Sequence, residues 1–148
     1  MTYVPEQQVQ GWHRHTTAAS GKFESVCCVT EEDEDAVYTI VKRTINGQSV
    51  RYVERLHSRR VEALEDAFFV DAGLSYSGAP ATTFGGLDHL EGEEVNILAD
   101  GAVMSRQVVT GGEVTLQQPA STVHVGLPIT ADLVTLPMAF EAQAAGQG

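Results

Sequence analysis

Short β-prone runs, in which hydrophobic and polar positions are interspersed, fill the first third of the chain, and turn-forming residues separate them. Four strands are expected there, over residues 10–15, 22–29, 36–44 and 49–56. The last two flank Asn46-Gly47, a dipeptide that readily takes the positive φ angles of a two-residue type I′ turn. Because the connections are short, the pattern predicts an antiparallel meander over residues 1–58.

The rest of the chain changes character twice. Residues 59–73 form a connector that favours either one or two helical turns or the start of a strand at Phe68. From residue 74 to 128, short β-prone runs alternate with Gly, Pro and Asp100-Gly101 turns, which predicts a small β-barrel closed by residues 121–125. Residues 129–148 read as a return segment and a tail without a stop signal, as expected of a fragment. The predicted fold class is therefore mainly β with a short helical connector.

Composition and charge argue against several classes of function. The chain has 148 residues, 43% of them hydrophobic, and a net charge of −11. No apolar run reaches the roughly 18 residues of a membrane span, and no signal-peptide pattern opens the chain. The negative charge argues against sequence-specific or broad nucleic-acid binding. Four arginines form either a local basic patch or a charge-balanced strand end: Arg51, Arg55, Arg59 and Arg60.

The two cysteines, Cys27 and Cys28, are adjacent on one expected strand. Neighbouring strand residues point to opposite faces, so a bridge between them would need unusual backbone geometry. We expect two small strand residues, one of them buried, and no disulfide framework, which fits assembly in a reducing cytoplasm.

Candidate chemistry is sparse. His13 and His15 share a strand face with the spacing of a two-ligand metal site, but no third ligand is defined by the sequence. Asp88-His89 suggests a carboxylate–imidazole pair, although a structural turn is favoured. The remaining histidines are His57 and His124. No Gly-x-Ser-x-Gly motif is present. The expectation is therefore no catalytic residue, no metal site, no cofactor and no enzymatic activity.

Other conspicuous residues also have structural explanations. Gly85-Gly86 and Gly111-Gly112 lack the Gly-Lys-Ser/Thr sequence of a phosphate loop and are expected in turns. The acidic run at residues 31–35 lacks the glycine and spacing of a calcium loop and is expected in solvent. Four aromatic residues are expected to pack on the sheet rather than stack on bases: Trp12, Phe23, Tyr38 and Tyr52.

The order of motifs resembles that of a known family. The motifs in the first third are Gly11-Trp-His-Arg-His-Thr-Thr17, Glu24-Ser-Val26, Tyr38-Thr-Ile-Val-Lys-Arg-Thr-Ile-Asn-Gly47 and Arg51-Tyr-Val-Glu-Arg-Leu56. With this order the chain resembles the nozzle, or tail tubular protein B-like, components of short-tailed bacteriophages, which are labelled packaged-DNA stabilisation or head-to-tail assembly proteins. The resemblance implies that the meander is a β-propeller blade. Because nozzle proteins are several times longer, it also implies a fragment or a shortened prophage product.

A second resemblance concerns residues 74–128. The motifs there are Gly73-Leu-Ser-Tyr-Ser-Gly78, Gly86-Leu-Asp-His-Leu-Glu-Gly92, Val95-Asn-Ile-Leu-Ala-Asp-Gly101 and Val123-His-Val-Gly-Leu-Pro128. They are similar to an inserted domain that has the small β-barrel fold of the first catalytic cysteine half domain of ubiquitin-activating enzymes. Both cysteines of this chain lie outside this zone, so no thioester chemistry is implied.

The resemblance implies a structural role in a bacteriophage or prophage tail. The expected partners are other tail or head–tail connector proteins, with a homo-oligomeric ring in the full-length protein. The expected location is the virion tail, assembled in the host bacterial cytoplasm. The alternative is a β-rich binding module that recognises a host-surface ligand such as carbohydrate.

Overall fold

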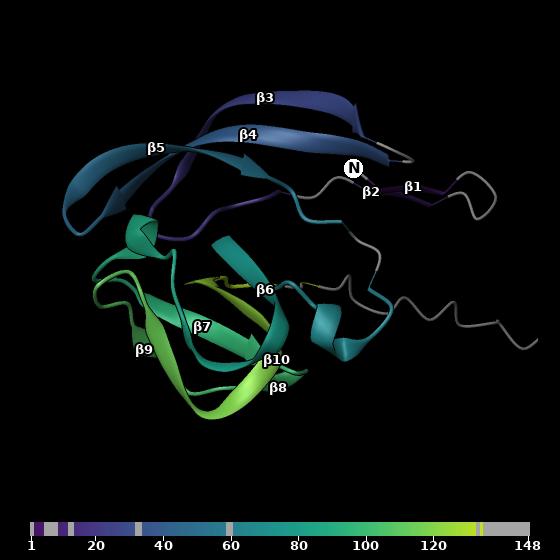
Figure 1. Ribbon diagram of the computed structural model, residues 1–148. Helices are drawn as coiled ribbons and strands as arrows, with labels where there is room; N and C mark the ends of the chain where they lie inside the picture. Colours follow the sequence, from purple (N-terminus) through teal and green to yellow (C-terminus); the bar gives the residue numbers. More distant parts are fainter. Residues whose placement is uncertain are drawn as a thin grey trace, which may run out of the picture.

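The computed structural model describes residues 2–4, 9–11, 14–31, 34–58, 61–132 and 134 (Figure 1). The fold is mainly β, as predicted. A three-stranded antiparallel sheet lies above a five-stranded one in Figure 1. Beside them, β1 (Thr2–Val4) pairs with β2 (Val9–Gly11). The strand expected over residues 10–15 is therefore wrong in extent, because residues 14 and 15 lie outside any strand and residues 12 and 13 lie outside the described residues.

The three-stranded sheet is the predicted meander. It contains β3 (Lys22–Glu31), β4 (Glu34–Ile45) and β5 (Gln48–Arg55), in the spatial order β3-β4-β5. The β4–β5 turn is the expected one, because Asn46 and Gly47 have φ angles of 46° and 72° between paired Ile45 and Gln48. A register shift interrupts the β3–β4 ladder between Phe23 and Ser25, as a β-bulge does.

The five-stranded sheet does not close into the barrel that the sequence predicted. Its strands are β6 (Val70–Phe84), β7 (Glu94–Ala99), β8 (Ala102–Val103), β9 (Gln107–Val108) and β10 (Val114–Pro128). They run in the order β6-β10-β7-β8, with β9 also paired to β7. Closure needs the first and last strands to pair, and within the described strands β6 and β8 form opposite ends of this path. The sheet is open.

Two long strands replace several of the short ones expected. The segment Ser77-Gly-Ala-Pro80, where Gly and Pro were expected to break the strand, lies inside β6, which has 15 residues. The strand accommodates Pro80 because β6 is an edge strand whose register against β10 shifts between Ser77 and Ala81. Proline lacks an N–H group, and edge strands and bulges tolerate that loss.

The connectors are short. The alternatives left open for residues 59–73 are both partly right, because one 3₁₀ turn, η2 (Leu64–Asp66), precedes the start of β6 at Val70. A second 3₁₀ turn, η3 (Asp88–Leu90), leads into β7. The predicted Asp100-Gly101 turn joins β7 to β8, with φ angles of 46° and 77°.

The two sheets share one hydrophobic core. Its buried side chains come mainly from β7 and β10, and Ile45 at the end of β4 joins them. Val50 and Tyr52 of β5 pack against the same cluster. By contrast, residues 22–30 of β3 are all exposed. Strands β4 and β5 therefore pack on the core, while β3, at the edge of the three-stranded sheet, extends beyond it.

Candidate functional site

The three-stranded sheet has a buried and an exposed face. Val41, Arg43 and Ile45 of β4 point toward the core. The opposite face, called the outer face here, carries Ile40, which is 38% exposed, and directly opposite it Val53, which is 74% exposed. Exposed apolar side chains that lie together are a common feature of protein interaction sites.

Val29 of β3 extends this apolar strip and is 46% exposed. It lies opposite Ala36, two places along β4 from Tyr38, which is opposite Cys27. Because alternate strand residues share a face, Cys27 and Val29 belong to the outer face with Ile40. The outer face thus carries apolar side chains from all three strands.

Ion pairs frame the strip. Arg51 bonds both carboxylate oxygens of Glu24, at 2.7 and 3.1 Å. Arg55 bridges Glu31, at 3.0 Å, and Glu34, at 2.6 Å. The Tyr38 hydroxyl also donates a hydrogen bond to the Glu31 carboxylate. The outer face therefore combines apolar side chains with charges that are largely neutralised in pairs.

These hydrogen bonds shift the pKa values of the side chains that form them. The hydrogen bond from Arg51 lowers the pKa of Glu24. Hydrogen bonds from Tyr38 and then Arg55 lower the pKa of Glu31, and the same Tyr38–Glu31 bond raises the pKa of Tyr38. Both carboxylates are therefore held in the charged form that pairs with arginine.

This geometry bears on the arginines that sequence analysis considered as a basic patch. Arg51 and Arg55 are each paired with carboxylates, which matches the alternative of a charge-balanced strand end. Residues 59 and 60 lie outside the described residues. The two placed arginines thus contribute little unpaired positive charge for a phosphate backbone to bind.

The cysteines differ from expectation in one respect. Both Cys27 and Cys28 are free thiols and both are exposed, so the expectation that one is buried is wrong. The reason is tertiary, because β3 extends past the core and has no layer over either face. Sequence alone gave no sign of which meander strand would remain uncovered.

The histidines do not assemble as a metal site in the described part of the chain, where no group of three His, Cys, Asp or Glu side chains could hold a metal ion. His15 is exposed, and residue 13 lies outside the described residues. The ring of His89 bonds the Ala72 carbonyl at 2.7 Å, and the His89 carbonyl accepts a hydrogen bond from Tyr52 at 2.8 Å. His89 therefore links the two sheets rather than forming the Asp88 pair considered from the sequence.

His124 forms a contact that sequence analysis missed. It is 6% exposed, its Nδ1 lies 2.7 Å from Ser75 Oγ, and its Nε2 lies 2.9 Å from the Glu65 carbonyl oxygen. A carbonyl only accepts, so Nε2 carries the proton and, in the neutral ring, Nδ1 accepts from Ser75. This is the spacing of a nucleophile and its base.

The surroundings of this Ser75–His124 pair indicate a structural role as well. Ser75 and His124 are opposite each other in the β6–β10 ladder. Phe68 packs edge-on against His124 at a ring distance of 5.5 Å, and His57 stacks on Phe68 at 4.6 Å. The pair therefore fastens the connector around η2 to the five-stranded sheet.

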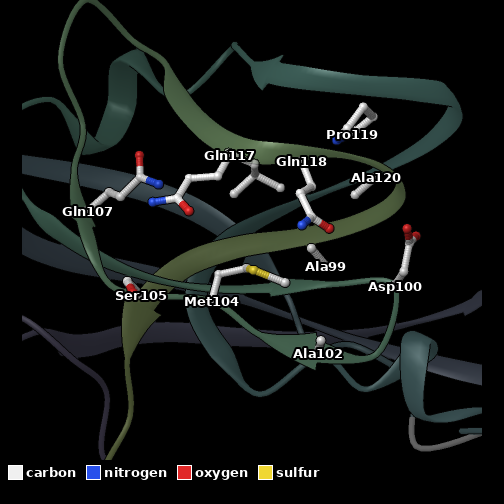
Figure 2. A pocket seen from close by; sticks show the side chains of 11 residues that line it. Ala99, Asp100, Ala102, Met104, Ser105, Gln107, Gln117, Gln118, Pro119 and Ala120 are labelled. Atoms are coloured by element: carbon white, nitrogen blue, oxygen red, sulfur yellow. The ribbon is translucent and has the colours of Figure 1, made fainter.

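A cavity of about 490 Å³ lies on the five-stranded sheet (Figure 2). It is formed where the β6–β10 register jumps from Thr115 to Ala120, so that the chain between them bulges out. Figure 2 shows Gln117 and Gln118 from this bulge across from Met104. The Gln107 amide bonds both the N–H and C=O of Thr115, as a neighbouring strand would. The cavity lining mixes polar and apolar side chains, and Asp100 is its one charged residue.

No protein family matches the chain, and no curated protein sequence matches it. None of the helices in the described ranges is long and apolar enough to cross a membrane.

Proposed function

We propose that this chain is a structural component of a bacteriophage or prophage tail, as part of a nozzle that joins head to tail and retains DNA. The ordered motifs from Gly11 to Leu56 support this proposal, because they resemble the corresponding segment of tail nozzle proteins. The activity is assembly: rigid β modules pack side by side, and symmetry closes them into a ring.

The observation that carries the proposal is the outer face of the three-stranded sheet. Val29, Ile40 and Val53 form an apolar strip there, and the surrounding arginines are already paired within the chain. Apolar contact with a neighbouring protein would therefore not require these arginines to be buried unpaired, which is a usual obstacle to a stable interface.

The net charge of −11 is consistent with this role. A channel wall that DNA slides past should not bind phosphates, and binding to phosphates comes largely from unpaired Lys and Arg.

The test is a substitution in the virus or prophage that encodes the chain. Val53→Glu places a carboxylate in the strip, which should weaken the contact with the neighbouring protein about tenfold or more, or by about 1.4 kcal/mol, so incorporation of the chain and infectious titre should both fall. Electron microscopy should show unjoined heads and tails or heads that have lost DNA.

Val103→Glu is the matched control. Val103 is 85% exposed on β8, in the other sheet, and the side-chain change is the same. Its particles should be normal. Normal, fully infectious particles with Val53→Glu would refute the use of this face, and absence of the chain from purified virions would refute the tail role.

A binding module for a host-surface carbohydrate is the second candidate, and the cavity in Figure 2 favours it. The amides of Gln117 and Gln118 can donate and accept hydrogen bonds, as sugar hydroxyls require. The cavity lining includes no aromatic ring on which a sugar could stack. Calorimetric titration with neutral oligosaccharides tests this candidate: binding that Gln118→Ala abolishes would support it, and no heat at millimolar ligand would exclude it.

A further inference from the structure

β3 is an open edge strand of unusual composition for an edge. It forms one end of the three-stranded sheet and is drawn outermost in Figure 1. Residues 22–30 are exposed, and the six residues from Ser25 to Thr30 carry no charge. A long, uncharged, exposed edge strand is a ready template for pairing with another strand.

The other edges in the described part of the chain have the features that usually block such pairing. β5 carries Arg51, Glu54 and Arg55 at short intervals. β6 contains Pro80, and the remaining edge strands, β1, β2, β8 and β9, have only two or three residues each. Charges, proline and short length all discourage added strands. The regular part of β3 has none of these features, and its one irregularity, at Phe23 to Ser25, leaves the stretch from Ser25 to Glu31 in continuous register.

The ladder determines which groups of β3 point outward. The Val37 carbonyl accepts a hydrogen bond from Leu56 at 2.8 Å, so Val37 directs its main-chain groups toward β5. Directions alternate along a strand, so Tyr38 directs its groups toward β3, where Cys27 is its partner. Cys27 therefore faces β4, and Val26, Cys28 and Thr30 direct their N–H and C=O groups to the open edge.

We propose that the β3 strands of two copies of this chain pair antiparallel about a two-fold axis at Cys28, which joins the two three-stranded sheets into one. The continuous stretch from Ser25 to Glu31 has Cys28 at its centre. Pairing this stretch with itself over its full length sets Cys28 opposite Cys28 of the second copy. Cys27 then lies opposite Val29, and Val26 opposite Thr30, so each residue meets one on the same face.

The charged residues of β3 favour the antiparallel direction. They lie near its two ends, with Lys22 and Glu24 at the start and Glu31 at the end. In this register Glu31 of one copy lies opposite the uncharged Ser25 of the other, with Glu24 and Lys22 beyond it, whereas parallel pairing in register would set Glu31 directly beside Glu31. Each copy carries a net charge of −11, so association should strengthen as salt screens the general repulsion.

Disulfide formation between two copies, through one cysteine at a time, tests the register of the proposed β3–β3 pairing. Cys27→Ser leaves Cys28 as the single thiol, and Cys28→Ser leaves Cys27. Residues that exchange hydrogen bonds across an antiparallel pair have Cα atoms about 5.5 Å apart, which a disulfide can span. Diamide accepts the two electrons and two protons that two thiols release as the S–S bond forms. We expect rapid covalent dimers from Cys27→Ser and monomers from Cys28→Ser on non-reducing gels.

Sedimentation equilibrium of the reduced wild-type chain tests the same pairing without a covalent bond. We expect a reversible dimer that higher salt strengthens. Cys28→Lys sets two ammonium groups opposite each other and should weaken the dimer about tenfold or more. Val103→Lys, which adds the same charge on β8, should leave the dimer intact.

Several outcomes would overturn the proposal. They are a wild-type chain that stays monomeric, cross-linking through Cys27 instead, through both cysteines equally or through neither, and equal effects of Cys28→Lys and Val103→Lys. The pairing goes beyond the proposed tail role and can fail separately from it. A chain that dimerises in solution but is absent from virions would refute only the tail role.

Discussion

Arg43 is the most deeply buried charge among the described residues, with a side chain that is 0% exposed. Its guanidinium bonds both carboxylate oxygens of Glu54 at 2.7 Å and donates a third hydrogen bond to the Ala18 carbonyl at 2.6 Å. Each partner comes from a different segment, so one side chain ties the loop before β3 to β4 and β5. Removing one member of such a group leaves the other buried polar groups without a hydrogen-bond partner.

The first prediction concerns this residue. Arg43→Met keeps the apolar stem but leaves the Glu54 carboxylate, which is 19% exposed, without its partner. We expect the free energy of unfolding to fall by about 2–4 kcal/mol, as for other broken buried pairs. Urea unfolding followed by circular dichroism measures it. Arg51→Met is the control, because the Arg51–Glu24 pair is exposed, at 59% and 35% for its two side chains. Equal shifts for the two variants would contradict the prediction.

At the scale of elements, two strands of the three-stranded sheet pack on the hydrophobic core and the third does not. β4 and β5 rest on the core through Ile45, Val50 and Tyr52, whereas β3 is held by its ladder to β4 and by side-chain contacts across the outer face. Glu31 is central to those contacts, because it joins Tyr38 and Arg55. The stability of the free side of the sheet should therefore depend on the charge of this carboxylate.

The second prediction follows from the lowered pKa of Glu31, whose reference value is 4.5. A carboxylate with a lower pKa in the folded state stabilises the fold above its unfolded pKa and loses that contribution as the pH falls through its folded pKa. Wild type should therefore exceed Glu31→Gln in stability at about pH 6, and the gap should narrow by about pH 3.5. Urea midpoints at the two pH values measure the gap. Glu94→Gln supplies the background for losing one surface carboxylate, and a gap that stays constant would disprove the assignment.

At the scale of the whole molecule, the two sheets share one hydrophobic core. Ile45 joins the hydrophobic cluster of the five-stranded sheet, Tyr52 bonds the His89 carbonyl at 2.8 Å, and the Asn46 amide bonds Glu93 at 2.9 Å. These contacts all come from the β4–β5 end of the upper sheet. They bind two segments that the sequence divides at about residue 58 into separate modules.

The third prediction tests this shared core. Ile45 is 5% exposed, and Ile45→Ala should cost about 2–4 kcal/mol through lost burial and the cavity left behind. Unfolding should stay a single transition by far-ultraviolet circular dichroism and by tyrosine absorbance. Ile40→Ala, on the outer face, should change stability much less. Two separate transitions in the wild-type chain would show that the sheets unfold independently.

The sequence alone determined the local features of this protein. The Asn46-Gly47 and Asp100-Gly101 turns were predictable because positive φ angles depend on the residues themselves, and the meander followed from short connections between β-prone runs. The mainly β class followed from the same signals. The pairing of Arg51 and Arg55 with carboxylates matched one of the two alternatives considered, and Glu24, Glu31 and Glu34 supply those carboxylates.

Tertiary structure decided everything that depends on which strands meet. Barrel closure, the two long strands and the inclusion of Pro80 in β6 depend on register between distant segments, which no local pattern specifies. Ser75 and His124 are 49 residues apart, and only the β6–β10 register brings them together. The exposure of Cys27 and Cys28 has the same origin. A strand's pattern shows which residues share a face, but whether another layer covers that face is decided by the packing of the whole chain.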